Sequence, residues 1–271
     1  MECSGSQNKD EIREQQNKKI KENLSKIKRK IAVLSGKGGV GKSTIAVNLA
    51  VYLAEKGFKT GLLDVDLHGP SVPTILGIKG FPLDMGNNSI IPVNYSENLK
   101  AVSVEGLLKD TDDALIWRGP MKIGVIRQFI ADVDWGPLDF LIIDSPPGTG
   151  DEPLTVAQEI PGAEALIITT PQEVSMSDVR KSVNFCKTLD MPILGLIENM
   201  SGFVCPGCGK KTDIFKSGTG EAAAKKMGIK FLGALPIEPG IMGSSDKGAP
   251  FVKESASESA KIFGSIVDKI L

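Results

Sequence analysis

The sequence predicts an α/β fold, with a mainly parallel central sheet and helices on both of its faces. Apolar, β-branched runs of strand length recur along the chain from residue 30 onward. These runs are nearly continuous rather than alternating, which is typical of strands that are covered on both faces. Helix-length segments separate most of them, and a strand–helix–strand repeat implies right-handed crossovers between parallel strands. With 271 residues, of which 41% are hydrophobic, the chain is long enough to bury a substantial core.

Seven of the apolar runs are expected to form strands of this sheet. They cover residues 30–35, 60–64, 99–104, 139–144, 165–170, 193–199 and 231–236. Helices are expected in the intervals between them, over 42–56, 121–131, 175–189 and 218–227. The interval 81–104 is the exception, because the turn signal "GNNS" separates two short extended runs there. That pattern predicts an inserted hairpin.

The two ends of the chain differ from the region between them. Residues 1–29 are highly charged, and their apolar stripe is limited to Ile20, Leu24 and Ile27, so we expect a mobile arm that ends in a short helix. Residues 30–271 are expected to form a single domain, because neither a repeat nor a Pro- or Ser-rich linker divides them. Residues 253–271 carry an apolar stripe opposite a face of balanced charge, which favours packing on the sheet over binding to lipid.

The charge balance and the apolar runs argue against several classes of protein. The net charge is −1, from 32 basic and 33 acidic side chains, so no overall field favours nucleic acid or a membrane surface. The longest apolar runs are far short of the roughly 20 residues that span a bilayer. The N-terminus lacks the apolar core of a secretory signal. We therefore expect a cytoplasmic protein whose partners include neither nucleic acid nor a membrane.

A glycine-rich loop follows the first expected strand and precedes the first expected helix. Its sequence, "GKGGVGKST", fits the phosphate-binding pattern G-x-x-x-x-G-K-S/T. Glycines allow backbone N–H groups to wrap around phosphate oxygens at a helix N-terminus. Lys42 is expected to contact the β- and γ-phosphates of ATP, and Ser43 to ligate Mg²⁺, which indicates a P-loop NTPase. The candidate nucleotide-binding residues of the loop are Gly36, Lys37, Gly38, Gly39, Val40, Gly41, Lys42, Ser43 and Thr44.

Acidic residues end two further strands, at the edge of the sheet where the loop is expected. Asp144 closes an apolar run and is expected to hold the shell of the Mg²⁺ ion. Gly148 follows it as the expected hinge of a switch loop that senses the γ-phosphate. Asp64 and Asp66 stand two residues apart after another strand. The role of Asp64 stays open, because this residue could equally cap the strand end.

A CxxC pair, Cys205 and Cys208 in "CPGCGK", supplies half of a four-ligand metal shell. Other ligands of the same chain are poorly placed, because Cys186 falls on the core face of an expected helix and His68 follows the second strand. Across a twofold axis, two copies of the pair supply four thiolates, which suit a [4Fe-4S] cluster or tetrahedral Zn²⁺. A redox-active or purely structural CxxC is the third possibility.

The loop resembles the deviant Walker A box of the ATPase group that includes the nitrogenase iron protein, MinD and ParA. The segment "KGGVGKST" carries the resemblance, because Lys37 is a second lysine just after the first glycine. The resemblance implies that Lys37 reaches across a dimer interface to the partner's transferring phosphoryl group. It also implies that Asp66 lies near Mg²⁺ and the attacking water, and that Asn199 and Pro236 contact adenine. The implied catalytic residues are Lys37, Lys42 and Asp66.

Segments beyond the loop are similar to the Mrp/ApbC family of iron–sulfur cluster carriers. They are "DVDLHGPSVP", "WRGPMK", "DFLIIDSPPGTGDEPLTV", "GLIENMSGFVCPGCGK" and "IFKSGTGEAAA", which lie within residues 30–251. The resemblance implies a slow ATPase that, as a homodimer, holds a [4Fe-4S] cluster between its CxxC pairs. Its implied partners are the apoproteins that receive the cluster and the scaffolds of cluster assembly. Cys3 stands alone, so no cluster is expected on the N-terminal arm.

Two other functions remain open from the sequence. One is a positioning ATPase of the MinD or ParA kind, which binds membrane or DNA. The other is a nucleotide-binding regulatory dimer that zinc bridges through the same four thiolates.

Overall fold

A central sheet organises the protein, whose computed structural model describes residues 4–67, 69–86, 89–107, 119–205, 207–208, 210–214, 217–254 and 257–271. Within these residues, eight strands pair in the order β12-β9-β8-β1-β7-β2-β6-β5. The strands are β1 (Ile27–Ser35), β2 (Thr60–Asp64), β5 (Val93–Ser96), β6 (Leu99–Ser103), β7 (Leu138–Asp144), β8 (Glu164–Thr169), β9 (Ile193–Glu198) and β12 (Phe231–Ala234). All pairs are parallel except β5 with β6, which are antiparallel.

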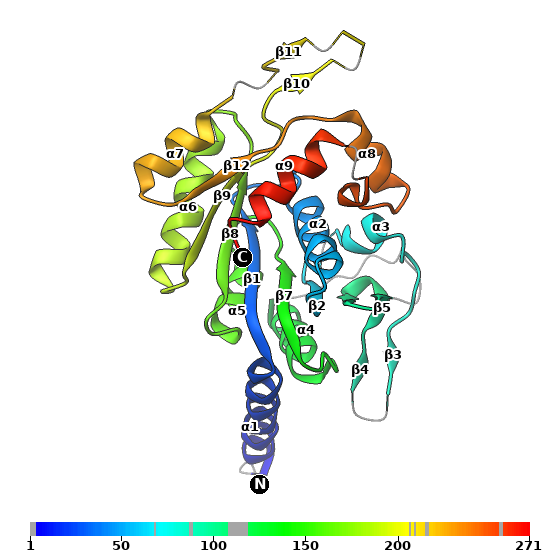
Figure 1. Cartoon of the computed structure of the whole chain (residues 1–271). Coiled ribbons are helices and arrows are strands. Elements are labelled where there is room, and N and C mark those ends of the chain that lie inside the picture. Colours follow the sequence, from blue (N-terminus) through cyan, green and yellow to red (C-terminus); the bar gives the residue numbers. More distant parts are fainter. Residues whose placement is uncertain are drawn as a thin grey trace.

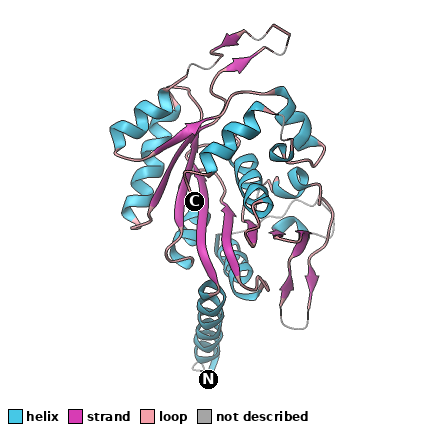
Figure 2. Ribbon diagram, viewed as in Figure 1, coloured by secondary structure: helices cyan, strands magenta, loops and turns pink. Residues whose placement is uncertain are grey.

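Helices cover both faces of this sheet (Figure 2). Along β1, Ile31 and Val33 enter one part of the core, and Ala32 and Leu34 enter the other, as the period of two in a strand requires. The first face packs against α2 (Lys42–Glu55), α3 (Val72–Leu76), α8 (Pro239–Asp246) and α9 (Glu258–Val267). The second packs against α1 (Ser4–Ser25), α4 (Gly119–Asp132), α5 (Asp151–Glu159), α6 (Ser175–Thr188) and α7 (Thr219–Met227). The predicted α/β fold is confirmed.

The expected strands and most of the expected helices occur within a few residues of their predicted bounds. Each of the seven predicted runs forms a parallel strand, and the helices expected between them are α2, α4, α6 and α7. The apolar stripe of α9 is buried on the sheet, with Phe263 and Val267 fully buried, as expected. Short 3-10 turns lie at η1 (Val104–Leu107) and η2 (Phe251–Lys253). Among the described residues, none of the helices has both the length and the apolar character that crossing a bilayer requires.

The insertion expected over 81–104 contains two antiparallel pairs rather than one. β3 (Asp84–Met85) pairs with β4 (Ile90–Ile91), and this hairpin projects from the body beside β5 (Figure 1). The second pair, β5 with β6, joins the edge of the main sheet. β6 is parallel to β2, so within the main sheet only β5 runs in the opposite direction. A turn signal alone could not show that a second antiparallel pair would follow the hairpin and join the main sheet.

The N-terminal segment departs from the mobile arm expected over residues 1–29. Helix α1 runs through 22 residues and projects below the body in Figure 1. Its C-terminal part is packed, because Ile20 and Leu24 are buried in the core. The Nδ2 atom of Asn23 donates to the carbonyl of Ala131 at 2.8 Å, which ties α1 to α4.

Strand β1 also begins earlier than the boundary at residue 30. Two charged residues, Lys28 and Arg29, made 27–29 resemble the N-terminal arm. In the structure both side chains form ion pairs at the end of the sheet. The ammonium of Lys28 lies 2.7 Å from the carboxylate of Asp139. Arg29 binds Glu164 at 2.9 Å and donates to the carbonyl of Ile270 at 2.7 Å. These partners are distant in sequence, so the strand start could not be read from local composition.

Candidate functional site

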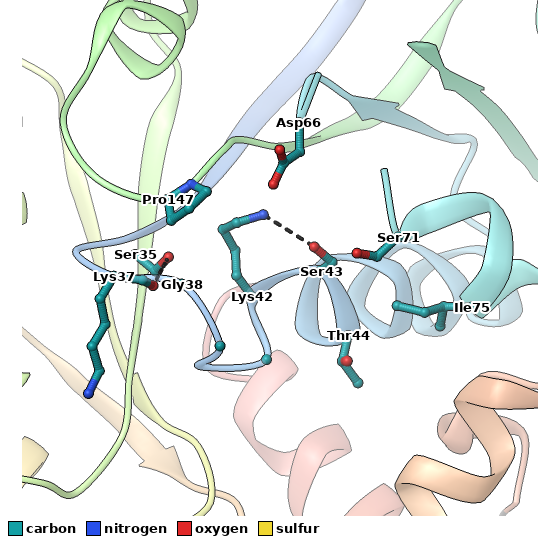
Figure 3. A pocket seen from close by; sticks show the side chains of 12 residues that line it. Ser35, Lys37, Gly38, Lys42, Ser43, Thr44, Asp66, Ser71, Ile75 and Pro147 are labelled. Atoms are coloured by element: carbon teal, nitrogen blue, oxygen red, sulfur yellow. Dashed lines mark hydrogen bonds between the residues drawn. The ribbon is translucent and has the colours of Figure 1, made fainter. Parts of the chain in front are cut away.

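The glycine-rich loop, residues 36–41, connects β1 to α2 at the carboxyl edge of the sheet. Gly39 and Gly41 have φ angles of 76° and 81°, in the left-handed region that favours glycine. A Cβ atom at Gly41 would lie 2.3 Å from Nδ2 of Asn199. The loop borders a cavity of about 240 Å³ (Figure 3). The lining residues are Ser35, Lys37, Gly38, Gly39, Gly41, Lys42, Ser43, Thr44, Asp66, Ser71, Ile75 and Pro147.

Lys42 is buried at the floor of this cavity and is paired with Asp144. Its Nζ atom lies 2.5 Å from Oδ1 of Asp144 and 3.2 Å from Oγ of Ser43. Burial raises the pKa of Asp144, and the charge of Lys42 opposes that shift. The second carboxylate oxygen of Asp144, Oδ2, is buried and has no hydrogen-bond partner among the described residues. The pair can therefore receive further ligands without first losing an existing contact at Oδ2.

Asp64 faces Asp144 across neighbouring strands, which the sequence left open. The two residues are direct partners in the register of β2 and β7. Burial, and then the charge of Asp144, raise the pKa of Asp64 from 3.8 to about 8. Asp64 accepts hydrogen bonds from the backbone N–H of Asp66 at 3.0 Å and from Oγ of Ser103 at 2.9 Å. Asp64 thus belongs to the buried acidic group and positions the backbone of Asp66 at the cavity.

Lys37 lies on the loop but points away from Lys42 (Figure 3). Its Nζ atom donates to Oε1 of Gln172 at 2.9 Å. Gln172 follows β8 and was not singled out from the sequence, because its partner lies 135 positions earlier. The structure therefore separates the two lysines of the loop: Lys42 faces the acidic group, and Lys37 faces the opposite side.

Asn199 and Pro236 line a second cavity, of about 350 Å³, which shares Gly41 and Thr44 with the first. Its wall is largely apolar and includes Ile45, Leu235, Ile237, Ile241 and Phe251. Asn199 also has a role that the sequence did not suggest, because its Nδ2 atom donates to the carbonyl of Val40 at 2.8 Å. An apolar cavity next to a phosphate loop suits the flat ring of a nucleobase.

The segment after β7, where the sequence predicted a switch, lies against the same loop. Pro147 lines the first cavity. Gly148 adopts a φ of 89° and donates its N–H to the carbonyl of Ser35 at 2.8 Å. This hydrogen bond connects the candidate hinge to the end of β1, one residue before the loop begins.

The CxxC pair lies on a hairpin that projects beyond the carboxyl edge of the sheet (Figure 1). Strand β10 (Phe203–Val204) pairs antiparallel with β11 (Lys211–Thr212). Cys205 is partly buried and Cys208 is exposed. The pKa of the Cys205 thiol is lowered by the backbone N–H of Gly207 first, and then by the backbone and side chain of Cys208. Sulfur that accepts two N–H groups in this way is stabilised as a thiolate, the form that binds metal.

No third ligand joins this pair within the described part of the chain. There, no group of three or more His, Cys, Asp or Glu side chains could hold a metal ion. Cys186 lies buried in α6, where burial raises its pKa to about 11. Cys3, His68 and the "WR" of "WRGPMK" lie outside the described residues. The structure therefore brings the loop and the acidic residues together, and it places the thiols apart from them on the hairpin.

Comparison with known proteins gives one family. The model of NUBPL iron-transfer P-loop NTPases (ParA) matches residues 26–271. A protein of Methanocaldococcus jannaschii named iron-sulfur cluster carrier protein is 52% identical, over 94% of this chain and 90% of that protein. A protein of Dictyostelium discoideum named cytosolic Fe-S cluster assembly factor NUBP2 homolog is 49% identical, over 87% of this chain and 91% of its own.

Solved structures share the architecture. The nucleotide-binding protein from Archaeoglobus fulgidus in complex with ADP is 38% identical, with a TM-score of 0.79 that covers 91% of this chain and 96% of that one. The cell division ATPase MinD from Pyrococcus furiosus has a TM-score of 0.63 at 24% identity, over 89% of this chain and 98% of that one, and shows the fold alone. These matches confirm the family resemblance that the motifs predicted.

Proposed function

Because the chain belongs to the family of NUBPL iron-transfer P-loop NTPases, we propose that it is an ATP-dependent carrier that binds a [4Fe-4S] cluster and transfers it to apoproteins. One observation carries the proposal. Cys205 and Cys208 lie together on a hairpin at the same sheet edge as the phosphate loop, with no third metal ligand among the described residues of their own chain. The names of the relatives, iron-sulfur cluster carrier and cytosolic assembly factor, support both the cargo and a cytosolic location.

Two copies of the chain complete the cluster site. Each contributes two thiolates, and four thiolates are the usual complement of a [4Fe-4S] cluster. The lowered pKa of Cys205 favours the ligating form of the thiol. Transfer is then a ligand exchange, in which thiolates of the receiving protein replace those of Cys205 and Cys208 without a change in electron count.

ATP binds along the loop in this proposal. The γ-phosphate competes with Asp144 for Lys42, because its charged oxygens accept strong hydrogen bonds from the ammonium group. Adenine occupies the apolar cavity beside Asn199 and Pro236. Gly148 senses the γ-phosphate as the hinge of the switch segment, to which its hydrogen bond with Ser35 connects it.

The acidic residues fit a Mg²⁺ ion, which prefers oxygen ligands. The unpartnered Oδ2 atom of Asp144 is the observation that supports the fit. Ser43 would ligate the ion, and Asp144 and Asp66 would hold its water shell. When bound, Mg²⁺ supplies charge neutralisation to the β- and γ-phosphates.

Hydrolysis requires both copies and is therefore slow in the separate chain. Lys37 borders the cavity of its own chain, but its ammonium group points away from Lys42 and binds Gln172, so in this proposal it acts on the nucleotide of a second copy. Asp66 orients the attacking water in the first cavity. A catalytic set that assembles only in the dimer links turnover to the encounter that also forms the cluster site.

Anaerobic reconstitution with iron and sulfide tests this function. We expect about four iron and four sulfide per two chains in the wild type, as for one [4Fe-4S] cluster, and neither in the Cys205→Ala, Cys208→Ala double variant. Light scattering on the same samples should show the mass of a dimer when the cluster is bound. Zinc in anaerobically purified protein, or iron binding that survives the double substitution, would exclude the cluster assignment. Activity toward a receiving protein should follow the iron content.

A further inference from the structure

Glu198, the last residue of β9, holds both ends of the segment that carries the thiols. Its side chain is fully buried. The carboxylate accepts a hydrogen bond from Oγ of Ser201 at 2.5 Å, where the chain leaves the sheet. It also accepts from the backbone N–H of Gly218 at 3.1 Å, and from that of Gly220, where the chain returns as α7. One charged group thus closes the base of the thiol hairpin, which we define as residues 201–218.

The fit at this base is close enough to require glycine where the chain enters α7. A Cβ atom at Gly220 would lie 2.8 Å from Oε2 of Glu198 and 3.0 Å from its Cβ atom. Gly218 has a φ of 76°, in the left-handed region. Hydrogen bonds to a buried carboxylate are stronger than those between neutral groups. The base of the hairpin is therefore a fixed point rather than a loose loop end.

This fixed point touches the phosphate loop by two separate routes. On the leaving side, Asn199 is the next residue after Glu198 and donates to the carbonyl of Val40 at 2.8 Å. On the returning side, Oγ1 of Thr219 donates to the carbonyl of Pro171 at 2.8 Å. Pro171 precedes Gln172, which accepts from Lys37 of the loop. Both routes begin at residues that contact the loop and end beside the Glu198 carboxylate.

We propose that Glu198 is a positioning residue that couples the phosphate loop to the thiol hairpin. When nucleotide moves the loop, Asn199 and Pro171 move with it, and the carboxylate passes the displacement to both ends of the hairpin. The inference rests on the proposed function, in which nucleotide at the loop changes the hold of Cys205 and Cys208 on their cargo. Glu198 itself lines neither cavity of the nucleotide site.

Alkylation of the two thiols measures this coupling without any cluster. The protein carries Cys3→Ser, so that the reactive thiols are those of the hairpin, and the Cys186 peptide serves as a buried internal reference. Rates with iodoacetamide are followed by mass spectrometry with and without a non-hydrolysable ATP analogue and Mg²⁺. We expect nucleotide to change the Cys205 and Cys208 rates at least about fivefold in this Cys3→Ser protein, the lower end of the range common between coupled sites.

Glu198→Gln is the decisive variant. The glutamine amide has one acceptor oxygen, but its nitrogen is a donor. That nitrogen would face one of the N–H or hydroxyl donors at the base of the hairpin, and no hydrogen bond could form there. We expect the nucleotide-dependent change to fall below about twofold, a loss of most of the coupling, while the affinity for nucleotide stays within about twofold of the wild type. Glu164→Gln is the matched control, because this residue accepts from Arg29 at 2.9 Å at the other end of the neighbouring strand. That control should retain the full response.

Ser201→Ala keeps the proposal testable if Glu198→Gln does not fold. This substitution removes the bond on the leaving side and retains the two on the returning side, so the response should fall to an intermediate value. An unchanged response in Ser201→Ala or in folded Glu198→Gln, or no response in the Cys3→Ser protein itself, would overturn the coupling. Iron and sulfide content is measured separately. Cluster binding without a nucleotide response overturns this inference alone, and a response without cluster binding overturns only the proposed cargo.

Discussion

The ammonium group of Lys42 lies 2.5 Å from Oδ1 of Asp144, and both side chains are almost completely buried. Asp64 stands opposite Asp144 in the same layer of the sheet. One lysine thus faces two buried carboxyl groups. The carboxylate of Asp144 therefore keeps the charge of Lys42 paired in the nucleotide-free protein.

Lys42→Met should abolish ATP turnover and also destabilise the nucleotide-free protein. Removal of one partner leaves a buried charge uncompensated, which costs about 3 kcal/mol or more. Urea unfolding without nucleotide measures the stability, and phosphate release measures the turnover. Asp144→Asn added to Lys42→Met removes the uncompensated charge, so it should recover part of the lost stability and none of the turnover. Full ATPase activity in Lys42→Met would contradict the assignment of the phosphate site.

The raised pKa of Asp64 predicts that the nucleotide-free, metal-free protein loses stability as pH rises. The folded state retains a proton up to about pH 8, whereas the unfolded state releases it near 3.8. The folded protein therefore binds more protons between these values, and the free energy of unfolding falls as pH increases through that window. Asp64→Asn removes the titrating group, so its unfolding temperature should exceed that of the wild type more at pH 8 than at pH 5.

Asp139→Asn is the control of opposite sign. The pKa of Asp139 is lowered, first by its hydrogen bond to Lys28 and then by the backbone of Lys59. The ionised Asp139 carboxylate therefore stabilises the folded protein above the pKa of the unfolded state, and this stabilisation is lost as pH falls. Asp139→Asn should lower the free energy of unfolding at pH 7 and have no effect near pH 2. Equal effects of Asp64→Asn at pH 5 and pH 8 would show that the Asp64 carboxyl is not protonated in the folded state.

Lys37→Ala should reduce turnover by about a thousandfold, the lower range for a residue that neutralises a transferring phosphoryl group, with little change in ATP affinity. The reason is that the ammonium group of Lys37 points away from Lys42 and binds Gln172 in its own chain. Mixing Lys37→Ala with Lys42→Met protein tests the direction of its action. A mixed dimer has one intact nucleotide site that receives Lys37 from the other chain, so about a quarter of wild-type activity should return in a statistical mixture. No recovery would mean that Lys37 acts within its own chain.

Gly41→Ala should cost more stability and nucleotide affinity than Gly39→Ala. Both glycines have left-handed φ angles, so alanine at either position is strained by about 1 kcal/mol or more. Only at Gly41 does the new Cβ atom also meet a neighbour, the amide of Asn199 at 2.3 Å, whereas nothing lies within 4 Å at Gly39. Urea unfolding and nucleotide titration compare the two variants. Equal losses would show that Asn199 moves away from the loop at no cost.

Leu24→Ala should destabilise the protein by about 2 kcal/mol or more, the usual cost of emptying a buried leucine site. Leu24, near the C-terminal end of α1, is only 6% exposed and is part of the core. Ile12→Ala, on the same helix but with 60% of the side chain exposed, should have almost no effect. Thermal unfolding of the two variants decides whether α1 belongs to the folded body or is an independent arm, for which neither substitution would matter.

The parallel strands were predictable because both of their faces are buried, which produces continuous apolar runs such as 139–144. The short helix α3 was not predicted, because five residues hold too little periodic pattern to separate a helix from a loop. Lys42, Ser43 and Asp144 follow from a local motif and a strand end. Gln172 and Glu198 do not, because each acts through partners that only the folded chain brings near.

The two ends of the thiol hairpin converge on one carboxylate, so the hairpin behaves as a cassette inserted between β9 and α7. Changes in its length or composition leave the strand, the helix and the nucleotide cavities in place. Cargo chemistry and ATP chemistry can therefore diversify independently in proteins of this architecture. A relative could exchange its cassette, and with it the ligand that it carries, while it retains the same nucleotide-binding body.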